Sequence, residues 1–173
     1  MTILLIIFGL LGCKKDQVNS NCSINYQIDN STSYTLGHTW KFIGFQNEGS
    51  STIDYPPCEG YDYYAQSNSD FEMTISFSDT LHHINDTIIY VFPKAFNGKA
   101  TLNDYFGSYE SDNSNKLTIG PIVASKMGGS KVLIDFEGRY LAALNHTERF
   151  VIQNNLLSIY YSQTEKLLFV FKK

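Results

Sequence analysis

Few side chains in this sequence could do chemistry, and none stands at the spacing of a familiar reactive site. His82 and His83 are adjacent, so a strand would point them to opposite faces, and no third metal ligand lies at a recognisable spacing. Ser125-Lys126 and Gly128–Lys131 have the residue types of a nucleophile or a phosphate loop, but neither G-x-x-x-x-G-K nor G-x-S-x-G occurs. We therefore expect no metal, no cofactor and no catalytic residue.

The acidic residues could supply a carboxylate pair for general acid and base catalysis, as in glycosidases. Glu110, Asp112 and Glu137 are scattered along the chain, and a cleft would have to bring two of them together. We interpret them instead as solvated residues of a loop and of a helix face.

Cys13 has a more specific context. The apolar run from Ile3 to Gly12 ends abruptly at Cys13-Lys14-Lys15, and a helix of ten residues rises only ~15 Å, half of a hydrocarbon core. Such a run is typical of a signal peptide, although no Lys or Arg precedes it. Leu10-Leu11-Gly12-Cys13 resembles a bacterial lipobox, in which the cysteine thiol receives diacylglycerol and becomes the new N-terminus. An ordinary secretory signal or a buried strand is the alternative.

This resemblance divides the chain into a lipoprotein signal peptide (1–12), a lipidated cysteine with a polar tether (13–35) and a folded domain (36–173). Two or more acyl chains, palmitate among them, give stable anchoring at ~0.8 kcal/mol per buried methylene. The expected location is the cell envelope, with the protein anchored in the outer membrane on its periplasmic or its surface face. The charged run after Cys13 weakly resembles surface-export tags of Bacteroidetes lipoproteins.

Cys22 and Cys58 remain once Cys13 is lipidated. The envelope outside the inner membrane is oxidising, so these two cysteines are candidates for one disulfide. Two free thiols are the alternative.

Composition narrows the class of protein. The chain has 173 residues, enough for one domain, and its 12 Tyr and 12 Phe favour pleated, half-buried surfaces over helical bundles. The formal net charge is -4, from 13 basic and 17 acidic residues. A chain with this net negative charge has no positive potential to attract a phosphate backbone, so nucleic acid is not the expected partner.

Hydrophobic periodicity predicts a mainly β domain. Residues 71–77 alternate strictly between apolar and polar, which indicates a strand with one buried face. Asn97-Gly98 predicts a tight turn, and the run 87–92 predicts a strand covered on both faces. Further strands are expected at 40–45, 105–110, 117–123, 150–152, 156–161 and 166–171, with a short one around 24–28.

One amphipathic helix is expected from about Lys131 to Asn145. Its apolar stripe is expected to consist of Val132, Phe136, Tyr140 and Leu144, joined by Leu133, Leu141 and Ala143. Ser130 can cap its N-terminus. The chain is therefore expected to have about eight strands and this one helix, which makes it a mainly β (α+β) protein.

From Lys99 onward the sequence resembles the META domain, the family of the heat-inducible envelope lipoproteins of enteric bacteria. The residues that carry this resemblance are Asn103-Asp104-Tyr105-Phe106-Gly107-Ser108-Tyr109, Leu117-Thr118-Ile119 and Ser125-Lys126-Met127, followed by the helix and the closing strands. Many members carry a cysteine before the Asn and another after the Met, where this chain has Leu102 and Gly128-Gly129.

The resemblance implies an antiparallel, partly open β-barrel of about eight strands with one helix packed across it, and it implies no established catalysis. The motif residues Asn103, Tyr105, Gly107, Tyr109 and Met127 look structural. Gly107 suits a bulge or a close backbone approach, and Asn103 or Asp104 suits a turn hydrogen bond. Tyr105, Phe106 and Tyr109 suit core and rim packing, with a ligand cage as the alternative.

Three functions follow as hypotheses. The first is a non-enzymatic, monomeric envelope lipoprotein that binds another envelope component or supports envelope integrity under stress. The second is a carrier of a small apolar ligand inside the barrel. The third is a hydrolase whose site is assembled from distant residues.

Overall fold

The computed structural model describes 26–30, 34–59, 71–78, 82–84, 87–90 and 94–173, with the backbone alone for 82–84 and 87–90. The expected signal peptide, Cys13 and Cys22 lie outside these residues. No helix in the described part of the chain is long and apolar enough to cross a bilayer.

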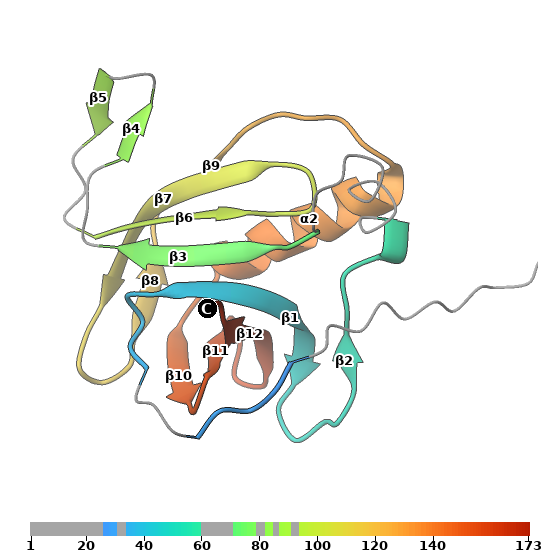
Figure 1. Cartoon of the computed structure of the whole chain (residues 1–173), viewed down its shortest axis with the longest axis vertical. Coiled ribbons are helices and arrows are strands. Elements are labelled where there is room, and N and C mark those ends of the chain that lie inside the picture. The colour runs from blue at the N-terminus through green and yellow to red at the C-terminus, as the bar shows by residue number, and fades with distance from the viewer. Residues whose placement is uncertain (1–25, 31–33, 60–70, 79–81, 85–86, 91–93) are drawn as a thin grey trace, which may run out of the picture.

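The described chain is a strongly bent antiparallel sheet with one helix across it (Figure 1). Its strands are β1 (Thr39–Asn47), β2 (Ile53–Asp54), β3 (Thr74–Ser78), β6 (Ala95–Lys99), β7 (Asp104–Ser111), β8 (Leu117–Ile119), β9 (Val123–Ala124), β10 (Arg149–Gln153), β11 (Leu156–Tyr160) and β12 (Glu165–Phe171). The helix is α2 (Lys131–Asn145). Eight strands follow one path, β10-β11-β12-β1-β3-β6-β7-β8, while β2 pairs with β1 and β9 with β7.

The two ends of this path meet and nearly close a barrel. Lys116 and Arg149 form an isolated antiparallel bridge. The N–H of Leu117 donates to Glu148 O at 3.1 Å, and the N–H of Phe150 donates to Asn115 O at 2.9 Å. The predicted fold, a mainly β, partly open antiparallel barrel with one helix, is confirmed.

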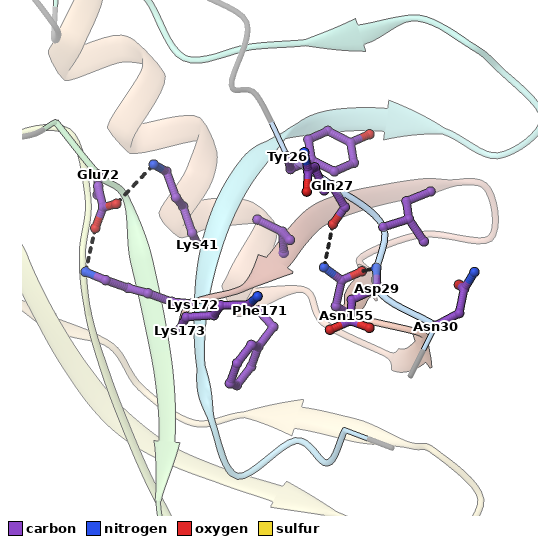
Figure 2. A pocket seen from close by; sticks show the side chains of 12 residues that line it. Tyr26, Gln27, Asp29, Asn30, Lys41, Glu72, Asn155, Phe171, Lys172 and Lys173 are labelled. Atoms are coloured by element: carbon purple, nitrogen blue, oxygen red, sulfur yellow. Dashed lines mark hydrogen bonds and ion pairs between the residues drawn. The ribbon is translucent and has the colours of Figure 1, made fainter. Parts of the chain in front are cut away.

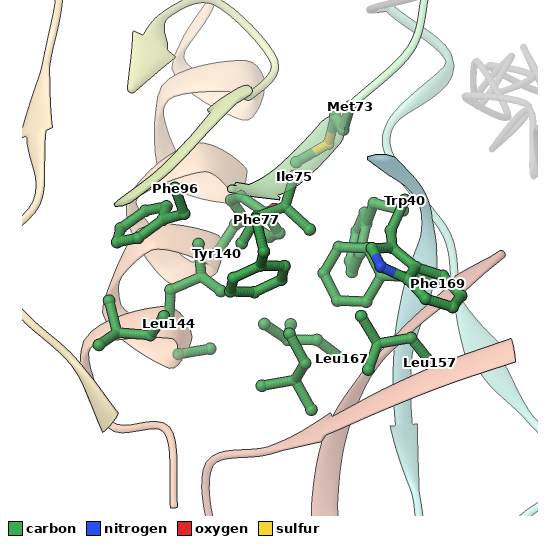
Figure 3. Packing of buried hydrophobic residues seen from close by; sticks show 14 of the residues in the cluster. Trp40, Met73, Ile75, Phe77, Phe96, Tyr140, Leu144, Leu157, Leu167 and Phe169 are labelled. Atoms are coloured by element: carbon green, nitrogen blue, oxygen red, sulfur yellow. The ribbon is translucent and has the colours of Figure 1, made fainter. Parts of the chain in front are cut away.

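The barrel interior is filled by the protein's own aromatic and aliphatic side chains (Figure 3). The alternation at 71–77 places Phe71, Met73, Ile75 and Phe77 inside, each at most 5% exposed. The largest side chains under 2% exposed also include Trp40, Phe42, Phe96, Tyr105, Tyr140 and Phe169. Each such burial contributes roughly 1.5–3 kcal/mol, so this packing is the main stabilising force of the fold.

Helix α2 begins and ends where the sequence predicts, but it is rotated relative to the expected stripe. Ser130 is the N-cap and accepts from the N–H of Leu133. The buried residues are Leu133, Glu137, Tyr140, Ala143 and Leu144, whereas Val132 is 47% exposed. Steps of four residues drift by about 40° each against a 3.6-residue turn, so Val132 has left the face that carries Leu144. The apolar stripe was wrong at Val132, and Glu137 lies in the buried face.

The turn predicted at Asn97-Gly98 was also wrong. Both residues lie in β6, where Gly98 is opposite Ile75 of β3 and Tyr105 of β7. A Cβ on Gly98 would stand 2.1 Å from Thr74 O and 2.5 Å from the phenol of Tyr105. The glycine therefore provides space for a tyrosine ring, and the chain reverses at Ala100–Asn103 instead, where the N–H of Ala100 donates to Asn103 O.

The strand predicted at 87–92 is present as β5 (Thr87–Tyr90), but it does not enter the barrel. It pairs with β4 (His82–Ile84) in a separate two-stranded sheet. Residues 26–28, inside the short strand expected around 24–28, are not in a strand. They run over the outside of the sheet, where Tyr26 packs against a small cluster of Ile43, Leu168 and Val170.

Candidate functional site

Glu137 of α2 organises the residues of the sequence motif. Its side chain points at the turn between β6 and β7, and the residue is 7% exposed. The carboxylate accepts from the N–H of Leu102 at 2.7 Å and from the N–H and side-chain amide of Asn103 at 3.0 and 2.5 Å. The hydroxyl of Thr101 lies 3.3 Å from the same carboxylate and donates to Leu133 O at 3.0 Å.

Asn103 joins this turn to the segment that follows β9. Its side-chain carbonyl accepts from the hydroxyl of Ser125 at 3.0 Å and from the N–H of Met127 at 2.6 Å. One buried amide therefore connects α2, the β6–β7 turn and residues 125–127. We call Glu137, Asn103 and Ser125 the polar joint.

The polar joint leaves little capacity for catalysis. The hydroxyl of Ser125 donates to Asn103 and accepts from the N–H of Asp104 at 3.2 Å, so it already has two partners. The oxygens of Glu137 are aimed at amides of the turn. Buried carboxylates satisfied by several donors are typical of structural roles.

The surface around the joint is apolar, although its floor is polar. Val123, Met127 and Ile134 are exposed by 52%, 52% and 48%. Met127 and Ile134 line a hollow of about 490 Å³ together with Leu102, Lys126, Gly128 and the joint. The chain passes close to Leu102 at Gly129, where a Cβ would stand 2.6 Å from a methyl group of Leu102. We call Val123, Lys126, Met127 and Ile134 the motif face.

Tyr105 lies beneath the joint and links β7 to β3 and α2. Its hydroxyl donates to Thr74 O at 2.8 Å and accepts from the hydroxyl of Tyr140 at 2.6 Å. Burial raises the pKa of both phenols well above the usual range. The pair stays neutral and fixes the angle between helix and sheet.

The remaining motif residues lie in the barrel wall. Gly107 is opposite Phe96, and a Cβ there would stand 2.8 Å from both the Phe96 ring and Pro121 O. Tyr109 is 7% exposed and packs edge-on against Phe77 at 5.0 Å between ring centroids. Met127 contacts the polar joint through its backbone N–H alone, and its side chain is exposed. The motif thus encodes both the joint and the wall behind it.

Sequence reasoning missed Glu137 by assigning it to a solvated helix face. A usable signal existed: at 3.6 residues per turn Glu137 falls between Leu133, Tyr140 and Leu144. A carboxylate in the centre of an apolar stripe needs donors from a neighbouring segment. Glu110 and Asp112 are exposed, as expected.

A second hollow of about 910 Å³ lies on the other side of the barrel (Figure 2). On one wall Glu72 pairs with Lys41 at 3.0 Å and with Lys172. Burial acts to raise the pKa of Glu72, but hydrogen bonds and the positive charges of Lys172 and Lys41 outweigh it and lower that pKa. On the other wall Asn155 accepts from the N–H of Asp29 at 2.8 Å and donates to Gln27 O at 2.7 Å. These contacts hold residues 27–29 and Lys172 to the barrel.

Cys58 is disulfide-bonded. Its predicted pairing with Cys22 stays a prediction, because Cys22 lies outside the described residues, as does Cys13. Histidines 82 and 83 are consecutive in β4, and their side chains are not among the described atoms. Within the described residues no three His, Cys, Asp or Glu side chains gather as a metal site would require.

Comparison with known proteins identifies one family. The family model of the META domain matches residues 72–173, which include β3, the motif, α2 and the closing strands. No curated protein is similar enough in sequence to match.

A solved structure with low sequence identity shares the fold, and a second one is similar over most of the chain. An NMR structure of a protein from Burkholderia xenovorans is 17% identical, covers 86% of this chain and 96% of its own, and has a TM-score of 0.55. A crystal structure of a DUF4847 family protein from Bacteroides vulgatus is 13% identical, covers 80% of this chain and 94% of its own, and has a TM-score of 0.49.

Proposed function

Because the chain belongs to the META domain family, we propose that it is a non-enzymatic cell-envelope protein that binds another envelope protein through the motif face. One observation carries this proposal. The polar atoms of the motif are hydrogen-bonded to one another inside the fold, whereas the apolar side chains beside them face water. Contiguous exposed apolar groups are typical of interaction sites, for a protein partner among others.

A lipid anchor at Cys13 would bring this face to its partner. The support is the sequence Leu10-Leu11-Gly12-Cys13 after a short apolar run. The protein would then be a monomer held in the outer membrane by its acyl chains. Its role in envelope integrity under stress would depend on the interaction with the partner protein. Replacement of Cys13 by Ser should abolish incorporation of labelled palmitate and release the protein from the membrane fraction, and retention of both would contradict the anchor.

The two other hypotheses receive less support. A small apolar ligand inside the barrel would need the space that Trp40, Phe42 and Phe169 occupy, and each of these side chains is essentially unexposed. A hydrolase would need a reactive group on the surface, but Ser125 and Glu137 are engaged in the polar joint. We therefore favour binding over transport or catalysis.

The test places a photo-crosslinking amino acid at Met127 or Ile134 in the full-length chain and irradiates intact cells. Both positions should give the same cross-linked envelope protein. The control position is Ile28, which is apolar and 58% exposed but lies at the other hollow. The double variant Met127→Glu and Ile134→Glu should abolish the partner's co-purification while leaving the melting temperature within a few degrees of the wild type. Equal products at Ile28 would count against the proposal.

A further inference from the structure

β9 and the residues after it present a sheet edge with which no strand of the described chain pairs. Residues 123–130 are all exposed, and Figure 1 shows this part of the chain running along the outer side of β7 toward the start of α2. β9 pairs with β7 through Tyr105 opposite Ala124 and Phe106 opposite Val123. Its other side faces outward.

The hydrogen-bond register identifies which backbone groups face outward. Ser125 donates to Asp104 O at 2.9 Å, so Ser125 faces β7. Bonded and non-bonded residues alternate along an antiparallel pair, so Val123 also faces β7, while Ala124 and Lys126 direct their N–H and C=O groups away from it. No hydrogen bond to the backbone of Ala124 or Lys126 is found within the described residues.

The same alternation of backbone groups is found along β8, where the barrel is closed. Along β8, Gly120 donates to Ser108 O on the β7 side, and Leu117 donates outward to Glu148 O. At Leu117 the outward N–H thus meets Glu148, the residue just before β10. At Ala124 and Lys126 the outward groups have no partner among the described residues, and they lie beside the exposed side chains of Val123 and Met127.

We propose that this edge, Ala124 to Lys126, takes up an extended segment of the partner protein as an additional antiparallel strand. The inference rests on the proposed function, since it names the partner segment for the same face. An extended backbone is the ligand that satisfies alternating outward donors and acceptors. Lys126 is the charged side chain on this edge, so the segment carries an acidic residue opposite it.

The edge is built for a short partner. Pro121 precedes it, Gly128-Gly129 follows it, and Lys126 stands within it. Proline and lysine are the residues that limit uncontrolled pairing at sheet edges. Any segment that pairs here is therefore short, and stacking of copies into a continuous sheet is opposed.

The test uses the mature full-length chain, labelled with ¹⁵N, and a blocked peptide Glu-Thr-Val-Thr-Val-Thr as the probe. Its Glu would face Lys126 and its first Val would face Ala124. We expect millimolar binding, chemical-shift changes confined to residues 122–127 and neighbouring β7, and slower amide exchange at Ala124 and Lys126. No shift change at several millimolar peptide, or changes elsewhere, would overturn the proposal.

Two variants isolate the backbone bonds. Peptide methylated on the amides of its Glu and first Val should bind on the order of tenfold more weakly. In the protein, Ala124→Pro removes one outward N–H without touching a bond to β7, and it should weaken binding similarly. Gln163→Pro, in the exposed turn before β12, is the matched control. Unchanged affinity for methylated peptide refutes the proposal even where Ala124→Pro misfolds.

Other occupants give distinct results. Concentration-dependent protection of Ala124 in the absence of peptide would mean that a second copy fills the edge, and it would refute the commitment to a partner segment. Cross-linking from Met127 with no peptide binding at the edge would leave the proposed function standing and this inference refuted.

Discussion

Two carboxylates each tie distant segments of this protein together, and they do so in opposite ways. Glu137 is buried and accepts from backbone and side-chain amides of the β6–β7 turn. Glu72 is about a quarter exposed and accepts from two lysines, Lys41 and Lys172. The first tie is short-ranged and excludes water, while the second is an ion pair that salt and water screen.

The contrast shows which of the two carboxylates has an arrangement that its surroundings strictly determine. Removal of a buried acceptor leaves its donors without water, so the polar joint has few alternative arrangements. The lysines around Glu72 can turn to solvent. We therefore expect substitutions at the joint to change folding and the motif face together, and substitutions at Glu72 to have local and salt-dependent effects.

The largest effect is expected for Glu137→Ala. The N–H groups of Leu102 and Asn103 and the Asn103 amide all lose their acceptor, and each buried unsatisfied donor costs ~1–3 kcal/mol. The free energy of unfolding from a urea titration should fall by ~3 kcal/mol or more. Asp135→Ala, on the exposed side of the same helix, is the control and should change stability by less than ~0.5 kcal/mol. Similar losses for both would show that the joint is not special.

Asn103→Ala should follow, with a loss of ~2 kcal/mol. The backbone N–H of Asn103 still reaches Glu137, but the N–H of Met127 and the hydroxyl of Ser125 lose their acceptor. Hydrogen exchange should therefore accelerate in residues 125–130 more than in the barrel strands. Asn113→Ala, in the exposed β7–β8 loop, is the control. An unchanged exchange rate at Met127 would mean that the joint does not hold the motif face.

The contrast between the two ties also explains what the sequence could predict. The alternation at 71–77, the end residues of α2 and the family motif depend on local patterns, and these predictions were confirmed. Glu137 and Gly98 depend on a partner far along the chain. A single sequence does not show that Asn103 meets a carboxylate 34 residues later, or that Tyr105 needs the space above a glycine.

The Val132 error has a related cause. Over three turns the difference between a spacing of four and a period of 3.6 residues rotates the stripe by about 120°, and the barrel it packs against decides which of two overlapping stripes is buried. The two-stranded sheet of β4 and β5 could not be predicted either, because an apolar β-branched run has the same pattern in a barrel and in a hairpin.

Tyr140→Phe tests the tie that lies between these extremes. The variant removes one hydroxyl from a buried pair while Tyr105 keeps its bond to Thr74 O, so the expected cost is ~1 kcal/mol. Tyr55→Phe is the control, since no partner of the Tyr55 hydroxyl is found among the described residues. A cost well above that of Asn103→Ala would reverse the ranking and make the phenol pair the main link between helix and sheet.

The smallest effect is expected for Glu72→Gln, and it should depend on pH. The pKa of Glu72 lies below its ordinary value of 4.5 in the folded state, so the ion pairs stabilise the fold above about pH 4.5 and that contribution is lost as pH falls through the folded pKa. Wild type and variant should differ by less than ~1 kcal/mol at pH 7 in low salt. The difference should disappear once the pH is below the lowered folded pKa of Glu72, and also in 1 M salt.

Glu110→Gln is the matched control for Glu72→Gln, because Glu110 is exposed and forms no ion pair within the described part of the chain. Because Lys41 and Lys172 keep their exposure to water when Glu72 is neutralised, neither lysine becomes a buried, unsatisfied charge. If Glu72→Gln instead cost as much as Glu137→Ala and resisted salt, the outer ion pair would be as enclosed as the polar joint. The two ties would then differ in chemistry but not in environment.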